Sequence, residues 1–285
     1  MDYKIASPSR GLAWFRGGVR MLDREPRGLL AVALGLLLLE QLPGLLIGVP
    51  ALSATLSVLL LLFGPALLAG LLYAVAEAEA GRPVPVTYLF AGLRQPGARA
   101  QLIVLGVVAL LAMLVMGLVL QRLLTAEQLQ LFVRIASQQI KADSPEFQAA
   151  APQLLKPLAV MMAIVFVLVV GLFFAVPRVM FDGKPALAAL LESLVACVAN
   201  TFALLVYGVI FVAAIFAAML ALGVVAMFLG LLGQLGMILL QLLALAFFVV
   251  VLVVSASGNY LAWREVFGRR DGPALAEPPR TGIVV

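Results

Sequence analysis

The chain alternates between long apolar stretches and short polar segments, and the apolar stretches are longer than a buried strand or core helix requires. Lys156 and Arg178 enclose 21 uncharged residues. Between Glu192 and Arg264 lie 71 residues without a formal charge, which is enough for two spans and a turn. Because about 20 apolar residues cross a bilayer once, this pattern predicts a multi-pass helical membrane protein.

Six spans account best for the pattern, so we expect an all-α, polytopic transmembrane helix bundle. A transmembrane β-barrel also satisfies its backbone hydrogen bonds in lipid, but its strands alternate apolar and polar residues. The stretch LAVMMAIVFVLVVGLFFAV shows no such alternation, which excludes the barrel. The spans are expected near residues 28–48, 53–76, 101–121, 158–180, 201–223 and 237–261.

The outer segment 122–157 is expected to contain two short amphipathic helices. Its TAEQ sequence, starting at Thr125, is typical of a capping box, in which a side-chain oxygen and an amide close the first helical turn. Its SPEF sequence, starting at Ser144, places a cap residue before a proline. We predict that both helices lie over the outer surface, as a lid, as a partner surface or as a connector that covers the bundle.

On the inner side, a Gly–basic–Pro turn occurs twice, as GRP at 81–83 and as GKP at 183–185. Each turn is followed by a segment that is able to form a short interfacial amphipathic helix before the next span. The stretch LAWFRGGVRMLDREP ahead of the first span is similar to such a segment. The sequence therefore predicts a threefold repeat of a surface helix followed by a hairpin of two spans.

The distribution of Lys and Arg predicts the orientation of the bundle. With both termini inside, 15 of the 19 basic residues lie on the cytoplasmic side and 4 on the outer side, as the positive-inside rule requires. We expect a cytoplasmic basic segment over 1–27 with an interfacial helix, a transmembrane domain over 28–263 and a disordered cytoplasmic tail over 264–285.

The net charge of +5 favours anionic lipid head groups on the cytoplasmic side as partners. Nucleic acid is not an expected partner, because the basic residues are spread over four membrane-adjacent segments instead of forming one stripe.

Several stretches, taken in order, carry a resemblance to a known family. They are GLAWFRGGVRMLDREP, FGPALLAGLLYAV, YLFAGLR, FFAVPRVMFDGKPALAALLESLVACVAN and SGNYLAWREVFG, and they cover most of the chain from about residue 11 to 268. In this order they resemble a family of uncharacterised proteobacterial integral inner-membrane proteins with about six helices. The resemblance implies the bacterial inner membrane and a six-helix architecture, but no activity and no functional residues.

The chain lacks the residues on which most enzymes depend. It contains no histidine and a single cysteine, Cys197, which excludes Ser-His-Asp and Cys-His arrangements and thiolate metal sites. The phosphate-binding loop, the dinucleotide fingerprint and the nucleophile elbow are also missing. Paired aspartates within spans are absent, since Asp182 lies at a span end. We therefore expect no enzymatic activity, no cofactor and no metal.

Glu40 is the main candidate for a functional side chain, because it is the only formal charge among the 49 residues of the range 28–76. An intramembrane carboxyl group is a functional candidate by default. One hypothesis makes Glu40 a proton- or cation-coupling site, with Gln41 or Gln241 as polar neighbours. The alternative places Glu40 near the outer interface, where Pro43 ends a shortened span and water solvates the carboxylate.

Small and polar residues at helical spacing are candidates for helix packing. Gly44 and Gly48 follow Glu40 by 4 and 8 residues, and small residues at this spacing let helix backbones approach closely. Glu40 is then expected to face another helix. Asn200, Ser255 and Asn259 lie near the cytoplasmic ends of the last two spans, where we expect them to form hydrogen bonds between helices.

Together these patterns predict an integral inner-membrane protein with a structural, accessory or envelope-related role. The alternative is a small transporter or channel component that uses Glu40, although a transport pathway usually needs more than one polar group near the midplane. A further alternative is a lipid-interacting membrane protein whose surface helices bind head groups.

Overall fold

The structure, a computed structural model, describes residues 3–46, 48–137 and 144–268, and helices are its only regular elements over that part of the chain. Six helices are long and apolar enough to cross a membrane. They are α2 (Pro26–Leu45), α3 (Pro50–Glu79), α5 (Pro96–Leu123), α7 (Pro145–Asp182), α9 (Thr201–Gly230) and α10 (Gln234–Val266). The predicted all-α, six-span transmembrane bundle is confirmed.

The spans form three hairpins, α2–α3, α5–α7 and α9–α10, and a short surface segment precedes each of them. These segments are α1 (Arg10–Met21), the 3-10 helix η1 (Val86–Phe90) with α4 (Ala91–Arg94), and α8 (Ala186–Ala199). The helices of all three predicted interfacial segments are therefore present, in the predicted order.

Each surface segment packs against the hairpin that comes before it. The η1–α4 segment contacts α2 and α3, and α8 contacts α7 and α5. The first segment, α1, has no preceding hairpin and packs instead against the last one, α9–α10. The three units therefore close into a ring, in which the beginning of the chain completes the packing of its end.

The second helix of each hairpin ends at a glycine with a positive φ. Gly81 follows α3 at φ +70°, Gly183 follows α7 at φ +64°, and Gly268 follows α10 at φ +78°. This left-handed conformation is readily adopted by glycine and is the common way to end a helix. The GRP and GKP turns thus have the same backbone role in two units, and Gly268 has it in the third.

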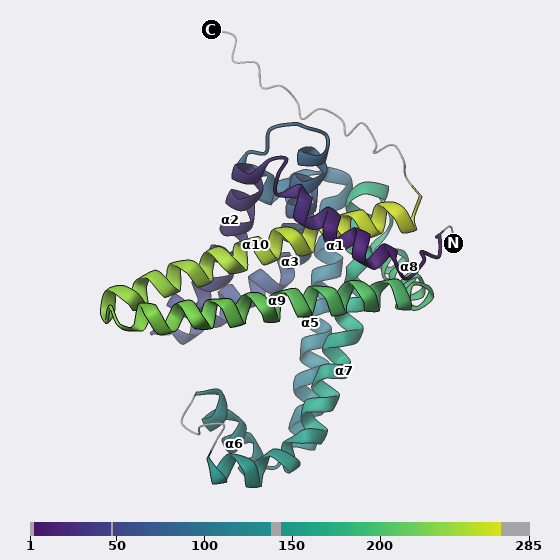
Figure 1. Ribbon diagram of the computed structural model, residues 1–285. Coiled ribbons are helices and arrows are strands. Elements are labelled where there is room, and N and C mark those ends of the chain that lie inside the picture. Colours follow the sequence, from purple (N-terminus) through teal and green to yellow (C-terminus); the bar gives the residue numbers. More distant parts are fainter. Residues whose placement is uncertain (1–2, 47, 138–143, 269–285) are drawn as a thin grey trace.

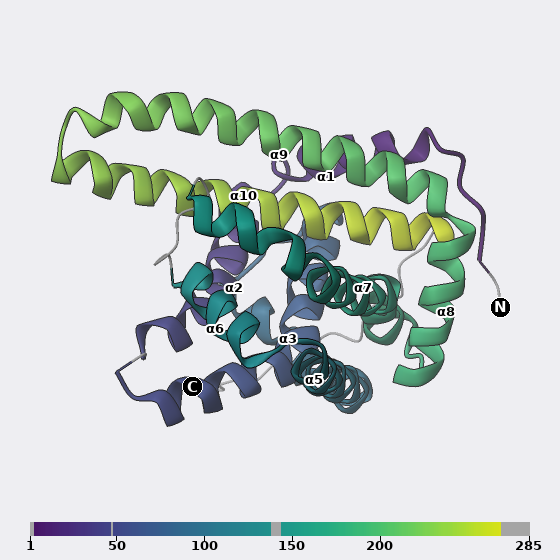
Figure 2. The same ribbon diagram turned by 90° about the horizontal axis from the view of Figure 1, so that it is seen from below.

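The buried core lies at one end of the molecule, which we call the base. The base contains α1, η1, α4, α8 and the adjoining ends of the spans; the opposite ends of the hairpins are the tips. The buried residues of α3 lie between Pro65 and Ala78, and those of α9 are Ala203 and Tyr207 near its start. Away from the base, the three hairpins run in different directions (Figures 1 and 2).

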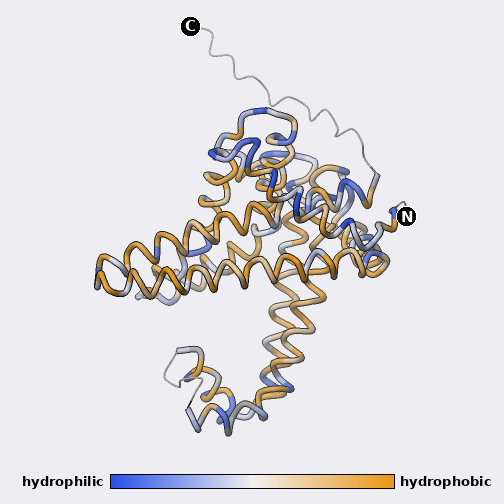
Figure 3. The backbone as a smooth tube through the Cα atoms, viewed as in Figure 1, coloured by the Kyte–Doolittle hydropathy of each residue, from blue (hydrophilic) through white to orange (hydrophobic). Residues whose placement is uncertain are grey.

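The polar residues follow the same division. Hydrophilic positions gather at the base and around α6 (Ala126–Ala136), while the hairpins between them are hydrophobic along most of their length (Figure 3). The exposed surface of the spans is therefore apolar, as expected of helices that are surrounded by lipid.

The prediction of two short helices over the outer surface is half wrong. The first helix is α6, and its capping box between Thr125 and Gln128 is present as predicted. Ser144 does cap a helix, but that helix is α7, which continues for 38 residues into the fourth span. Pro152 and Pro157 lie inside α7, and prolines near the end of a transmembrane helix need not stop it.

The predicted covering role of this segment is also wrong. Figure 1 shows α6 at the far end of the α5–α7 hairpin, turned aside from its axis and separated from the α9–α10 hairpin, and its main contact is with α7. The reason is that the hairpins diverge, so that one tip does not reach the others. The predicted disordered tail over 264–285 begins too early, because α10 continues to Val266. Beyond Gly268 the predicted tail lies outside the described residues.

Candidate functional site

Glu40 lies on α2 in the half of the helix that points away from the base, and its side chain is exposed. Gln41 beside it and Gln241 on α10 are exposed as well. No hydrogen bond or ion pair joins these three side chains to one another or to any other residue that the structure describes. The predicted polar cluster around Glu40 is not formed.

The prediction that Gly44 and Gly48 pack against another helix is wrong. A Cβ atom added at either glycine would meet no described atom within 4 Å. The buried face of α2 includes Leu29, Ala33 and Leu36, and helical periodicity continues this face to Glu40. Glu40 itself is exposed, so the expected contact between Glu40 and another helix is not made.

Asn200 is the polar packing residue with the clearest role. Its side chain is fully buried at the junction of α8 and α9. Its Oδ1 accepts a hydrogen bond from the Ala6 backbone N–H at 2.7 Å, and its Nδ2 donates to the carbonyls of Ala196 at 2.9 Å and Lys4 at 3.2 Å. The Lys4 N–H in turn donates to the Val266 carbonyl at 2.6 Å. Asn200 thereby fastens the first described residues to the base.

Asn259 and Ser255 also lie between helices, but they act differently. Asn259 Nδ2 donates to the Phe173 carbonyl at 2.8 Å and so joins α10 to α7, as predicted. Ser255 is half-buried, and its backbone carbonyl lies 3.5 Å from the Tyr207 hydroxyl group of α9. The contact at Ser255 is therefore made by its backbone.

A network of ion pairs at the base was not predicted from the sequence. Two consecutive residues at the end of α10 bind the ends of the other two hairpins. Trp263 Nε1 donates to Asp182 Oδ2 of α7 at 3.2 Å, and Arg264 Nη1 donates to Glu79 Oε2 of α3. The three second helices α3, α7 and α10 are thus tied together at their last turns.

Arg178 is the most buried cation of this network. It donates to Asp182 at 2.5 Å and to Glu192 of α8, and its guanidinium lies 4.3 Å from the centre of the Phe267 ring. Partial burial raises the pKa of Glu192, but hydrogen bonds from Arg178 and Lys184 outweigh this effect, so that the pKa lies below its usual range. Glu192 is therefore charged at neutral pH.

The other two units contribute equivalent pairs. Arg10 of α1 donates twice to Glu265 of α10, at 2.6 and 2.7 Å, and Trp14 Nε1 donates to the same carboxylate at 2.9 Å. Arg82, in the first glycine turn, makes a two-pronged contact with the buried Glu77 at 2.5 and 2.6 Å. Such pairing compensates for the cost of burying a carboxylate.

We call these charged residues the base network. It consists of five acids and five bases: Glu77, Glu79, Asp182, Glu192 and Glu265, with Arg10, Arg82, Arg178, Lys184 and Arg264. Each acid has a cation at hydrogen-bond distance, so none is available as a free general base. Several of these pairs join one helix to another.

Other reactive groups are equally constrained. Burial raises the pKa of Cys197 to about 12, so the side chain is a neutral thiol and not a nucleophile at neutral pH. Among the described residues, no group of three His, Cys, Asp or Glu side chains is placed to hold a metal ion.

The sequence contained one signal for the base network, which is an acid within a few residues of each glycine that ends α3, α7 or α10. Arg178 and Asp182 are only four residues apart, and Arg82 and Glu77 only five. The sequence contained no signal for the two pairs that join α10 to α3 and to α1, because these partners are far apart along the chain. Glu79 and Arg264 are 185 residues apart, and Arg10 and Glu265 are 255 apart.

The fold and these contacts define a class, the multi-pass helical membrane proteins with three hairpins packed at a common base. No protein-family model, no curated protein and no solved structure matches the chain.

Proposed function

We propose that the protein resides in a bacterial inner membrane, with its base at the cytoplasmic surface and with a structural or accessory role. Exposed basic side chains at the base support this orientation. Those without an ion pair to any described residue are Lys4, Arg16, Arg20, Arg24, Arg27, Arg94 and Arg99. Such residues beside membrane spans attract anionic head groups of the cytoplasmic leaflet.

One observation carries the accessory role. The buried core and the base network lie at one end, whereas the tip halves of the three hairpins diverge and expose large apolar side chains such as Val58, Met162 and Leu220. A helix that is apolar all round is stable in a membrane without packing against its own chain. The three hairpins thus present apolar surface, from a rigid base, to other membrane components.

Catalysis is not part of this proposal. The acids of the base network are neutralised by cations, and Cys197 is a buried neutral thiol. A scaffold needs neither a nucleophile nor a general base.

Site-directed photocrosslinking tests the accessory role. A photoreactive residue is placed singly at Val58, Met162 and Leu220, one on each hairpin, and at Leu187 as a control that is exposed at the base. We expect one and the same protein to be crosslinked from at least two hairpins but not from Leu187, and its level in the membrane to fall when the chain is deleted. Crosslinks to lipid alone from all three hairpins would contradict the proposal.

A coupling role for Glu40 is the second candidate, and the unpaired state of this intramembrane carboxyl group favours it. Glu40→Gln separates the two functions, because it keeps the size and removes the charge. Under the accessory role, growth and the photocrosslinks described above are unchanged. Loss of a pH-dependent phenotype in Glu40→Gln, with Gln41→Ala as the unaffected control, would favour transport instead.

A further inference from the structure

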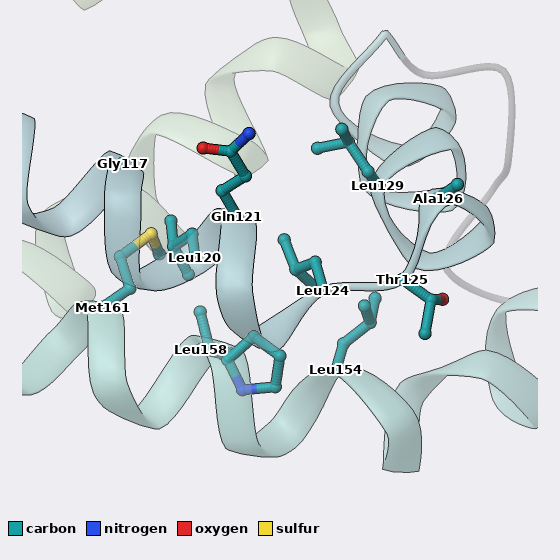
Figure 4. Close-up of a pocket in the computed structure, with 11 residues that line it drawn as sticks. Gly117, Leu120, Gln121, Leu124, Thr125, Ala126, Leu129, Leu154, Leu158 and Met161 are labelled. Carbon is teal, nitrogen blue, oxygen red and sulfur yellow. The ribbon is translucent and has the colours of Figure 1, made fainter.

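The tip of the α5–α7 hairpin contains an apolar cavity of about 610 Å³. Its walls come from α5, α6 and α7 and the link between α5 and α6 (Figure 4). Leucines from all of these segments line it, including Leu120, Leu129 and Leu158, and Gln121 contributes the amide that lies at its edge. Its volume falls within the range of about 300–1,000 Å³ that is usual for small-molecule sites.

The position of the cavity determines what surrounds it. Helix α5 has 28 residues. At about 1.5 Å per residue, the helix is longer than the hydrocarbon core of the bilayer is thick, which is roughly 30 Å. The cavity residues of α5 therefore lie where the acyl chains meet the head groups. Beside them, Leu129 and Val133 of α6 are 53% and 57% exposed, as in an amphipathic helix that lies at the membrane interface.

Two cations are the sequence neighbours of residues that line the cavity. Arg122 follows the lining residue Gln121 on α5, and Lys156 precedes the lining residue Pro157 on α7. Both side chains are exposed, and neither has an ion pair with a described residue. Glu127 is the exposed acid on α6, so the positive charges are in excess around the cavity.

We propose that this cavity binds one acyl chain of an anionic phospholipid from the leaflet at the tips, whose phosphate is held by Arg122 and Lys156. The bilayer is itself apolar, so entry of the chain gains little from the hydrophobic effect. Selectivity comes from the shape of the cavity and from the two cations. This site is separate from the accessory role proposed above and does not depend on it.

Filling the cavity tests the site directly. A Cβ added at Gly117 meets no described atom within 4 Å, and Gly117 lines the cavity, so Gly117→Phe is chosen to place a ring in this space. Gly223 on α9 has equally open surroundings and does not line the cavity, which makes Gly223→Phe the matched control. Ala126→Phe fills the same cavity from α6, in case Gly117→Phe does not fold.

The measurement is native mass spectrometry of the full-length protein in detergent, with phosphatidylglycerol or phosphatidylcholine added. We expect the original protein and Gly223→Phe to retain one phosphatidylglycerol that Gly117→Phe and Ala126→Phe do not retain. Arg122→Gln or Lys156→Gln should each lower the preference for phosphatidylglycerol about fivefold. Equal retention by Gly117→Phe and Gly223→Phe, or no preference between the two lipids, would overturn the proposal.

Discussion

At the scale of single residues, buried amide side chains and ion pairs hold the helices of the base together. Asn200 uses both ends of its amide group, and its partners come from the first described residues and from α8. Exposed Gln241 on α10 has the same functional group but no hydrogen bond to a described residue. The two amides therefore form a natural pair for measuring what burial and pairing contribute.

Asn200→Ala should lower the stability of the protein by about 1–3 kcal/mol, because it leaves buried backbone groups without partners. It should also release the segment before α1, so that trypsin cleaves more rapidly at Lys4 and Arg10. Thermal unfolding in detergent and the rate of cleavage measure the two effects. Gln241→Ala is the control, and equal changes in both variants would show that Asn200 does not fasten the N-terminal segment.

The depressed pKa of Glu192 makes the α7–α8 contact dependent on pH. Because the pKa in the folded protein lies below the unfolded value of about 4.3, the ion pair contributes fully above that value. The contribution is lost as the pH falls through the folded pKa.

Glu192→Gln should therefore lower the unfolding temperature at pH 7, by an amount that corresponds to about 1–3 kcal/mol. The difference from the unsubstituted protein should shrink as the pH falls below about 4.3. Melting curves in detergent over a pH series provide the measurement, with the exposed Glu127→Gln as control. A difference that stays constant down to low pH would show that the charge of Glu192 is not responsible.

Single residues also show what a sequence can and cannot predict. Asn259 was predicted to join helices because an amide in a span needs a partner, and it does so. Gly44 and Gly48 were predicted to pack because of their spacing, but spacing identifies only a face and not the presence of a neighbour. The lipid-facing and protein-facing sides of α2 are both apolar, so hydropathy could not distinguish them.

At the scale of helices, the ends were more predictable than the contacts. The cap residue Ser144 before a proline, and the glycines of the GRP and GKP turns after α3 and α7, marked helix ends that the structure confirms. The sequence predicted a separate second short helix in the outer segment, but this helix is the beginning of α7. The start signal at Ser144 was clear, and no stop signal followed it.

Close approach of helix backbones depends on glycine at a few positions, and α5 provides a test. A Cβ at Gly106 would collide with the Leu62 carbonyl of α3, whereas a Cβ at Gly117 on the same helix would meet open space. Gly106→Ala should therefore destabilise the protein by about 1–3 kcal/mol, as overpacking of a core does. Gly117→Ala should be neutral or slightly stabilising, because alanine favours helix.

Thermal unfolding of the two variants, measured side by side in detergent, checks this prediction. If Gly106→Ala and Gly117→Ala behave alike, the close contact between α3 and α5 is not part of the folded protein.

At the scale of the whole molecule, three hairpins share one base, and the ring is closed by the packing of α1 on α9 and α10. The number of spans and the order of surface helix and hairpin followed from the sequence. The divergence of the tips could not be predicted from the sequence. Leu71 is fully buried and Leu220 is 59% exposed, yet both are leucines in apolar helices. In a membrane protein, hydropathy locates the spans but not their packing partners.

Cysteine labelling of intact cells tests the central claim, which is that the six helices cross the membrane with the base inside and all three tips outside. In a Cys197→Ala background, single cysteines replace Ser137 and Leu232 at two tips, and Ala80 and Arg94 at the base. We expect a membrane-impermeant maleimide to label Ser137→Cys and Leu232→Cys in intact cells, and Ala80→Cys and Arg94→Cys only after lysis. Labelling of either base position before lysis, or protection of either tip, would contradict this arrangement.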